Sequence, residues 1–248
     1  MPLTDAAFAA LASIVALAFA VEACVGFGAT IITVALGSLL VPIERLLPVF
    51  IPLNVALSAW LSLRYWRDVD VRLLARRMLP LMALGLPLGL FALRRANGAA
   101  LTRGFGMFVL VLALLELRQA LAPARPHTEP ARWVRALALF AGGVVHGAFG
   151  TGGPLAVWVA GHELRRPAAF RSTLSALWLT LNIALVCAYA AAGSIDRASL
   201  GATARLGAAL LIGLAVGEWA HRRVPERAFR PVVFGGLALV GAVLVVRG

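Results

Sequence analysis

The apolar run from Ala6 to Val41 limits the fold of this chain more than any other feature. It contains 36 residues, and Glu22 is the one charged residue among them. As a straight α-helix the run would be about 54 Å long, whereas the hydrocarbon core of a bilayer is about 30 Å thick. We therefore expect the chain to stop and turn at Gly26-Phe27-Gly28. A first helix would end at about Cys24 and a shorter one would begin at about Ala29.

Composition places this run in a membrane. The chain is 61% hydrophobic and 14% charged, with a mean hydropathy of +0.91, whereas soluble domains are about 45–50% apolar and about 25% charged. A soluble fold could not bury that much apolar surface, so we predict an all-α, polytopic helical membrane protein. A second long run, 136–161, is also broken by glycines, and the other expected helices are Leu46–Leu63, Met78–Leu93, Gly104–Leu117, Ser172–Ala192, Ala204–Ala220 and Val232–Val246.

The charges follow a topological pattern. All 23 basic residues are arginine, the formal net charge is +12, and the arginines stand in short clusters between the apolar runs. Clusters of this kind are typical of membrane topology signals and not of a nucleic-acid-binding face, so no nucleic-acid partner is expected. Arginine without lysine in an alanine-rich chain indicates a bacterial origin. The predicted location is the bacterial inner membrane, with multiple passes through the lipid bilayer; the oligomeric state is left open.

The second broken run repeats the first. At an offset of 124 residues Glu22 aligns with His146, and past a short gap, at an offset of 128, Asn54 aligns with Asn182. We therefore predict two halves of one design: a first transmembrane repeat at 1–120, a linker at 121–134 and a second repeat at 135–248. Other aligned pairs include Gly26 with Gly150, Gly28 with Gly152, Ala29 with Gly153, Asp68 with Asp196, Gly85 with Gly213, and Gly89 with Gly217.

The arginine distribution favours one topology for the broken runs. If each run is a hairpin that enters and leaves on the same face, 16 of the 23 arginines lie on one side of the membrane. If each run crosses once, 12 lie on one side. Because cytoplasmic loops carry the excess of positive charge, we favour the hairpins, with both termini outside. Each half is then a glycine-broken re-entrant hairpin plus three transmembrane helices, and the two repeats are inverted relative to one another.

The glycine-broken segments are also the predicted substrate site. Broken helices in matching positions of two inverted halves point to the substrate site of a secondary transporter. The N-terminal end of a half-helix carries partial positive charge and favours an anion. The alternative is that the glycines only permit close helix packing, as Gly85, Gly89, Gly213 and Gly217 are expected to do. The predicted substrate-binding residues are Gly26, Gly28, Ala29, Asn54, Gly150, Thr151, Gly152, Gly153, Pro154 and Asn182.

Four polar side chains inside the apolar runs have two interpretations each. Glu22 and His146 precede their breaks by one helical turn, so they fit a proton relay that couples transport, but they also fit polar groups that bind the backbone at a helix break. Asn54 and Asn182 fit the lining of a polar cavity or a hydrogen bond between two helices. The sequence leaves each of these alternatives open.

Enzyme motifs are missing from the chain. His162-Glu163 has no second histidine one turn later, and neither a Gly-x-Ser-x-Gly sequence nor a phosphate-binding Walker loop occurs. We therefore predict no catalytic residue, no metal and no cofactor. The alternatives to a transporter are an anion channel, a membrane-embedded enzyme and a partner subunit that transports nothing itself.

The glycine motifs resemble those of the sulfite exporter TauE/SafE family of bacterial membrane transporters. The resemblance lies in Gly26-Phe27-Gly28-Ala29-Thr30, in the segment from Gly147 to Leu155, and in the arginine- and proline-containing stretch before Ser172-Thr173. Ala29 stands where the family pattern has a third glycine. The resemblance implies a secondary transporter, described as an exporter, whose partner is a small inorganic or organosulfonate anion such as sulfite.

Overall fold

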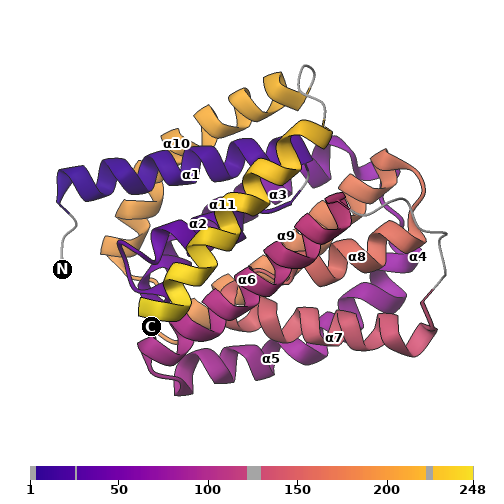
Figure 1. The fold of residues 1–248 in the computed structure, drawn as a ribbon, viewed down its shortest axis with the longest axis horizontal. Coiled ribbons are helices and arrows are strands. Elements are labelled where there is room, and N and C mark those ends of the chain that lie inside the picture. Colours follow the sequence, from indigo (N-terminus) through magenta and orange to yellow (C-terminus); the bar gives the residue numbers. More distant parts are fainter. Residues whose placement is uncertain (1–3, 26, 122–129, 222–225, 248) are drawn as a thin grey trace. The chain divides into compact units, whose positions relative to one another are not determined.

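The structure is a computed structural model that describes residues 4–25, 27–121, 130–221 and 226–247. Every regular element in these ranges is helical, which confirms the predicted all-α class (Figure 1). In chain order the elements are α1 (Asp5–Val25), α2 (Ala29–Gly37), α3 (Ile43–Arg64), the 3₁₀ turn η1 (Trp66–Asp68), α4 (Val71–Leu73), the π-helical η2 (Leu74–Met78), α5 (Leu79–Arg95), α6 (Gly98–Leu121), α7 (Arg132–Phe149), α8 (Gly153–Glu163), α9 (Pro167–Ala191), α10 (Arg197–His221) and α11 (Glu226–Arg247).

Six stretches of the described chain are long and apolar enough to span a membrane, which agrees with the predicted membrane class. Five of them correspond to helices that the sequence predicted as full crossings. The sixth is Asp5–Ala23, the first arm of the first broken run, and α11 contributes only the shorter apolar stretch Gly235–Arg247. The spans are Asp5–Ala23, Ile43–Arg64, Val71–Arg95, Gly98–Leu115, Pro167–Ala191 and Arg197–Ala220.

Short polar side chains define where several helices begin. The Asp70 carboxylate accepts a hydrogen bond from the Leu73 amide at 2.9 Å, and the Asp196 carboxylate accepts one from the Ser199 amide at 2.7 Å. These bonds satisfy amides that have no acceptor inside the helix. The Ser199 hydroxyl accepts from the Asp196 amide in return, and the bonds from Ser199 hold the pKa of the Asp196 carboxyl below its usual value.

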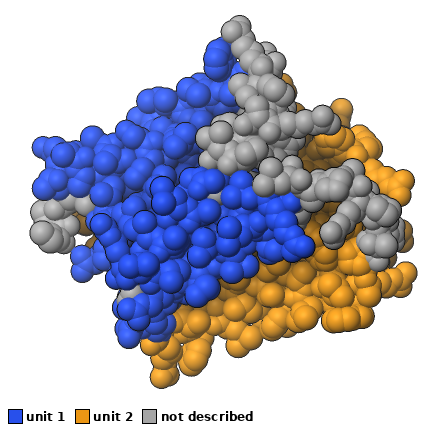
Figure 2. Space-filling model, viewed as in Figure 1, with its two compact units in different colours: residues 1–46, 96–127, 206–248 blue, residues 47–95, 128–205 orange. Residues whose placement is uncertain are grey.

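The chain divides into two compact units (Figure 2). One unit contains residues 1–46, 96–127 and 206–248, and the other contains residues 47–95 and 128–205. Each unit therefore takes segments from both halves of the sequence. The division into repeats at 1–120 and 135–248 is a statement about sequence order and stays a prediction.

The glycine pairs make the close helix contacts that the sequence predicted. In the unit that contains α5 and α7, a Cβ added to Gly85 would meet the carbonyl of Phe140, and one added to Gly89 would lie 2.6 Å from the Ala148 amide. In the other unit, a Cβ on Gly217 of α10 would lie 2.6 Å from Ala23 Cβ of α1. Helix backbones approach this closely only where side chains are missing.

Both broken runs fold back on themselves. Gly37 at the end of α2 lies beside Leu11 near the start of α1, where an added Cβ would be 3.4 Å from Leu11 Cδ1. Arg135 in the first turn of α7 forms a 2.9 Å ion pair with Glu163, the last residue of α8. In each run the second helix therefore returns along the first, which is the geometry of a helical hairpin.

Candidate functional site

The first break depends on a left-handed backbone position. Gly28 precedes α2 with φ of 113°, a conformation that side chains rarely adopt. Space does not require glycine there, because the nearest atom to an added Cβ would be Val21 Cγ1 at 3.9 Å. Gly26, which was also predicted to contact the substrate, lies outside the described residues.

A buried carboxylate binds the end of α2. Glu22 is 4% exposed, and its Oε2 accepts a hydrogen bond from the Ala29 amide at 2.8 Å. Ala29 is the first residue of α2, and the first amides of a helix have no intrahelical acceptor. The side chain of the helix before the break therefore caps the helix after it. The polar residue and the half-helix end that the sequence predicted are thus in direct contact.

The second break uses its glycines differently. Gly150 ends α7 with φ of 66°, and its amide donates to the His146 carbonyl at 2.7 Å. Gly152 has an ordinary φ of −86°, but an added Cβ would collide with the Gly142 carbonyl and lie 2.8 Å from Met82 Cε. Glycine is required at 152 by close packing. α8 begins beside Pro154, in the first-turn position expected for proline, and Thr151 and Gly153 are buried.

His146 caps the second break in a defined tautomer. Its Nδ1 accepts a hydrogen bond from the Gly152 amide at 3.2 Å, and its ring stacks on Trp178 with the ring centroids 5.8 Å apart. Because Nδ1 is the acceptor, we assign the proton of the neutral ring to Nε2. His146 is 1% exposed, and Nε2 has no hydrogen-bond partner in the described part of the chain. The ring therefore offers one buried donor.

A chain of polar contacts connects this break to α3. The Asn182 Nδ2 atom donates to Asn54 Oδ1 at 3.2 Å, and the Ser58 hydroxyl donates to the same oxygen at 3.2 Å. The Asn182 side chain also interacts with His146, although neither His146 Nε2 nor Asn182 Oδ1 reaches hydrogen-bond geometry with any described group. The asparagines thus form the helix-to-helix bond that was one of their two interpretations.

The predicted site residues fall into two groups. Glu22, Gly28 and Ala29 lie together at the first break, in one unit. Residues 150–154, His146 and the two asparagines lie in the other unit. The predicted site residues did not include Ser58 and Trp178. Each stands four residues from an asparagine on the same helix, and this spacing is the signal that could have identified both.

Comparison with known proteins identifies the family of the chain. The family model "Sulfite exporter TauE/SafE" matches residues 11–244, from α1 into α11. A search of curated proteins and a search of solved structures returned no match. The family match confirms the resemblance seen in the glycine motifs. The chain therefore belongs to the sulfite exporter TauE/SafE family, and it is a membrane transporter and not an enzyme.

Proposed function

We propose that this transporter exports a small oxyanion, such as sulfite or an organosulfonate, and that the two glycine breaks form its substrate machinery. The observation that carries the proposal is the capping of both half-helices: a buried ionisable side chain accepts the hydrogen bond of an amide at the start of α2 and of α8. Buried helix N-termini are suited to binding anions, because their amides lack intrahelical acceptors and carry partial positive charge. Family membership supports a sulfur oxyanion.

The inverted-repeat topology is part of the proposal. The antiparallel arms of α1–α2 and α7–α8 support re-entrant hairpins. Further support comes from the aligned glycine pairs: α5 of the first half packs on α7 of the second, and α10 of the second half packs on α1 of the first. Each of these packed pairs joins one helix of the first half of the sequence to one helix of the second half, as expected for a transporter built from two repeats.

We assign the substrate contact mainly to the end of α8. An ionised Glu22 already compensates the positive end of α2, whereas the neutral ring at α8 adds no negative charge. Near that end lie the Nε2–H of His146 and the amides around Thr151 and Gly153. The hydrogen bond between Asn182 and Asn54 joins α9 to α3 and fixes the position of Asn182 beside the His146 ring. Gly28 and Ala29 lie at the corresponding end of α2, where the Glu22 carboxylate compensates the positive charge.

Proton coupling follows from the same bonds. A proton added to Nδ1 of His146 converts that atom from an acceptor to a donor, so the Gly152 amide loses its partner and the ring becomes a cation. Both changes favour an anion at the end of α8. A proton on Glu22 removes the negative charge beside α2. Proton binding and anion binding are therefore linked, and each strengthens the other.

The test is sulfite flux into and out of liposomes that contain the purified protein. We expect saturable flux that is inhibited by methanesulfonate and not by an amine of similar size, and a pH gradient should drive sulfite accumulation. Inhibition by the amine would contradict the anion assignment. Flux that neither saturates nor responds to the pH gradient would indicate an anion channel instead.

A further inference from the structure

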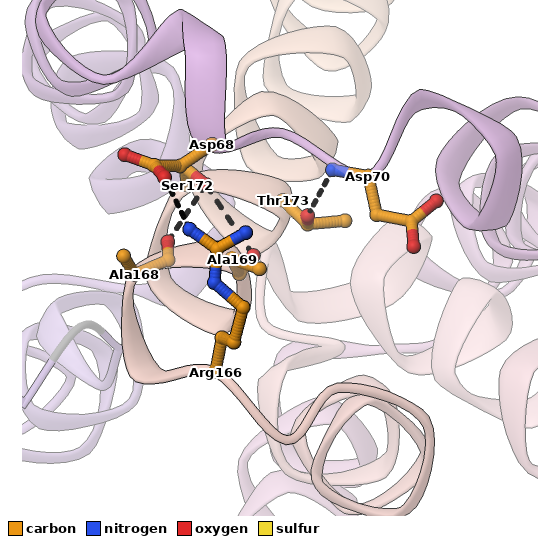
Figure 3. Close-up of polar contacts among 7 residues, drawn as sticks. All are labelled: Asp68, Asp70, Arg166, Ala168, Ala169, Ser172 and Thr173. Atoms are coloured by element: carbon orange, nitrogen blue, oxygen red, sulfur yellow. Dashed lines mark hydrogen bonds and ion pairs between the residues drawn. The ribbon is translucent and has the colours of Figure 1, made fainter.

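The connection between α3 and α4, residues Tyr65–Asp70, is bound to the beginning of α9 (Figure 3). The Asp68 carboxylate pairs with Arg166 at 3.1 Å, and the Asp70 amide donates to Thr173 Oγ1 at 2.9 Å. The Tyr65 ring lies against Arg171, with the guanidinium carbon 5.4 Å from the ring centroid. Three residues of this connection therefore contact the stretch from Arg166 to Thr173, where α9 begins.

Arg171 has donors without acceptors. Its Nε and Nη2 atoms are shielded from solvent and have no hydrogen-bond partner among the described residues. These two nitrogens form one edge of the planar guanidinium, the edge that binds carboxylates and phosphates through two parallel hydrogen bonds. A cation with unpaired buried donors is costly, because it has lost water and gained no counter-charge.

The nearby acids do not supply that counter-charge. Asp68 binds Arg166, and Asp70 Oδ1 accepts the Leu73 amide at the start of α4. Glu163, the last residue of α8, forms ion pairs with both Arg77 and Arg135, at 2.8 and 2.9 Å. The free edge of Arg171 therefore matches a partner that the described residues do not provide.

We propose that the Nε and Nη2 edge of Arg171 is a second oxyanion-binding site, closed in this conformation by the Tyr65–Asp70 connection. The ligand is an oxyanion that presents two oxygens, as sulfite and sulfonates do. When the connection moves away from α9, the edge becomes accessible and the anion forms two charge-assisted hydrogen bonds. The proposal rests on the proposed function only for the identity of the anion, since the unpaired edge is an independent observation.

The test compares Arg171→Gln and Arg171→Lys with Arg165→Gln. Arg165 is an exposed residue of the same segment, so its substitution removes the same charge without touching the proposed site. Sulfite binding is measured as the sulfite-dependent rise in melting temperature of the purified protein, and transport as the KM of flux in liposomes. We expect Arg171→Gln to weaken binding by about tenfold or more. Arg171→Lys, which keeps the charge but loses the two-donor edge, should fall between it and the wild type.

The lipid composition distinguishes two possible ligands of the Arg171 edge, which are soluble sulfite and the phosphate group of a lipid. Both readouts are repeated in neutral phosphatidylcholine and with phosphatidylglycerol added. If the edge binds soluble sulfite, the effect of Arg171→Gln persists in neutral lipid. If that effect appears only with phosphatidylglycerol, the ligand is a lipid phosphate and the assignment to sulfite is overturned.

Thr173→Val tests the closing connection, because it removes the acceptor of the Asp70 amide with little change in side-chain size. We expect faster sulfite entry at low concentration in this variant, and no gain when Arg171→Gln is also present. A gain that survives Arg171→Gln would overturn the role of the connection in closing this site.

Failure of this inference is distinguishable from failure of the proposed function. If the wild type transports sulfite and Arg171→Gln behaves like Arg165→Gln in both readouts, the second site is wrong and the transport function stands. If sulfite stabilises the wild type in an Arg171-dependent way but no flux occurs, the site stands and the transport proposal fails. If the wild type neither binds nor moves sulfite or methanesulfonate, both are wrong.

Discussion

The two helix breaks achieve the same turn by different means. At the first, Gly28 takes a φ of 113° with open space around it, and a carboxylate binds the amide of Ala29 at 2.8 Å. At the second, Gly152 keeps an ordinary φ but is enclosed by the Gly142 carbonyl, and an imidazole binds its amide at 3.2 Å. The first glycine serves backbone conformation, and the second serves packing.

The chemical difference between the caps bears on function. A carboxylate compensates the roughly +0.5 charge at a helix N-terminus, whereas a neutral imidazole leaves it available. The imidazole also has a buried Nε2 donor with no partner among the described groups. Under the proposed function the two segments therefore differ in their relation to the anion: the positive end of α2 is charge-compensated, and the end of α8 contacts the anion.

The largest expected effect comes from the steric difference. Gly152→Val should destabilise the protein by about 3 kcal/mol, because even a single Cβ would collide with the Gly142 carbonyl. Gly28→Ala has room for its methyl group and should cost about 1–2 kcal/mol, the strain of a left-handed backbone. Unfolding of both variants in detergent measures the difference. Equal losses at the two positions would show that the breaks do not differ in this way.

The next prediction separates the two nitrogens of His146. Asparagine places its side-chain oxygen near the position of Nδ1, so His146→Asn should keep the cap on Gly152 and lose the Nε2 donor. We expect near-normal stability of the cap and about tenfold weaker sulfite binding. His146→Gln places an amide near Nε2 and loses the cap, so it should cost about 1 kcal/mol of stability and retain more of the binding.

Sulfite-dependent melting and flux KM measure both variants. If His146→Asn binds sulfite as well as the wild type, Nε2 does not contact the anion. The α8 end would then differ from the end of α2 only in that no carboxylate compensates its positive charge.

The sequence predicted helix positions well. The first helix was expected to end at about Cys24 and ends at Val25, and the second was expected at Ala29 and begins there. The run Met78–Leu93 became α5, Leu79–Arg95. Apolar length and glycine breaks determine these bounds, because a chain in hydrocarbon must satisfy its backbone hydrogen bonds within each helix.

The contacts across helices were less predictable. Spacing placed Glu22 one turn before Gly26, but its hydrogen bond crosses the break to Ala29, seven residues away. The bond between Asn54 and Asn182 joins residues 128 positions apart, and Arg171, whose Nε and Nη2 have no partner among the described residues, lies against Tyr65 of another segment. Hydropathy does not specify how a helix is rotated about its axis, so it predicts that a polar residue is buried and not which group it contacts.

Glu22→Gln tests the first helix break and should have a smaller effect on folding. Glutamine keeps a side-chain oxygen that can accept from the Ala29 amide, so stability should change by less than about 1 kcal/mol. It cannot bind or release a proton, so sulfite flux should lose the part of its response to a pH gradient that depends on Glu22 while remaining saturable. An unchanged response would assign the coupling to His146 or to another group.

The smallest effect is expected for Ser58→Ala. This variant tests whether the polar contacts beside α8 take part in anion binding or only support the residues that do. The Ser58 hydroxyl and the Asn182 amide each donate a hydrogen bond to Asn54 Oδ1. Ser58→Ala therefore leaves Asn54 Oδ1 with a donor and should cost about 0.5–1 kcal/mol of stability. Sulfite affinity should stay within about twofold of the wild type, a change of roughly 0.4 kcal/mol. Asn182→Leu is the matched comparison, because it removes the bond to Asn54 together with the neighbour of His146. If Ser58→Ala weakens sulfite binding as much as His146→Asn does, anion affinity depends on the whole polar chain from α3 to the break, and the α8 end alone is not the site.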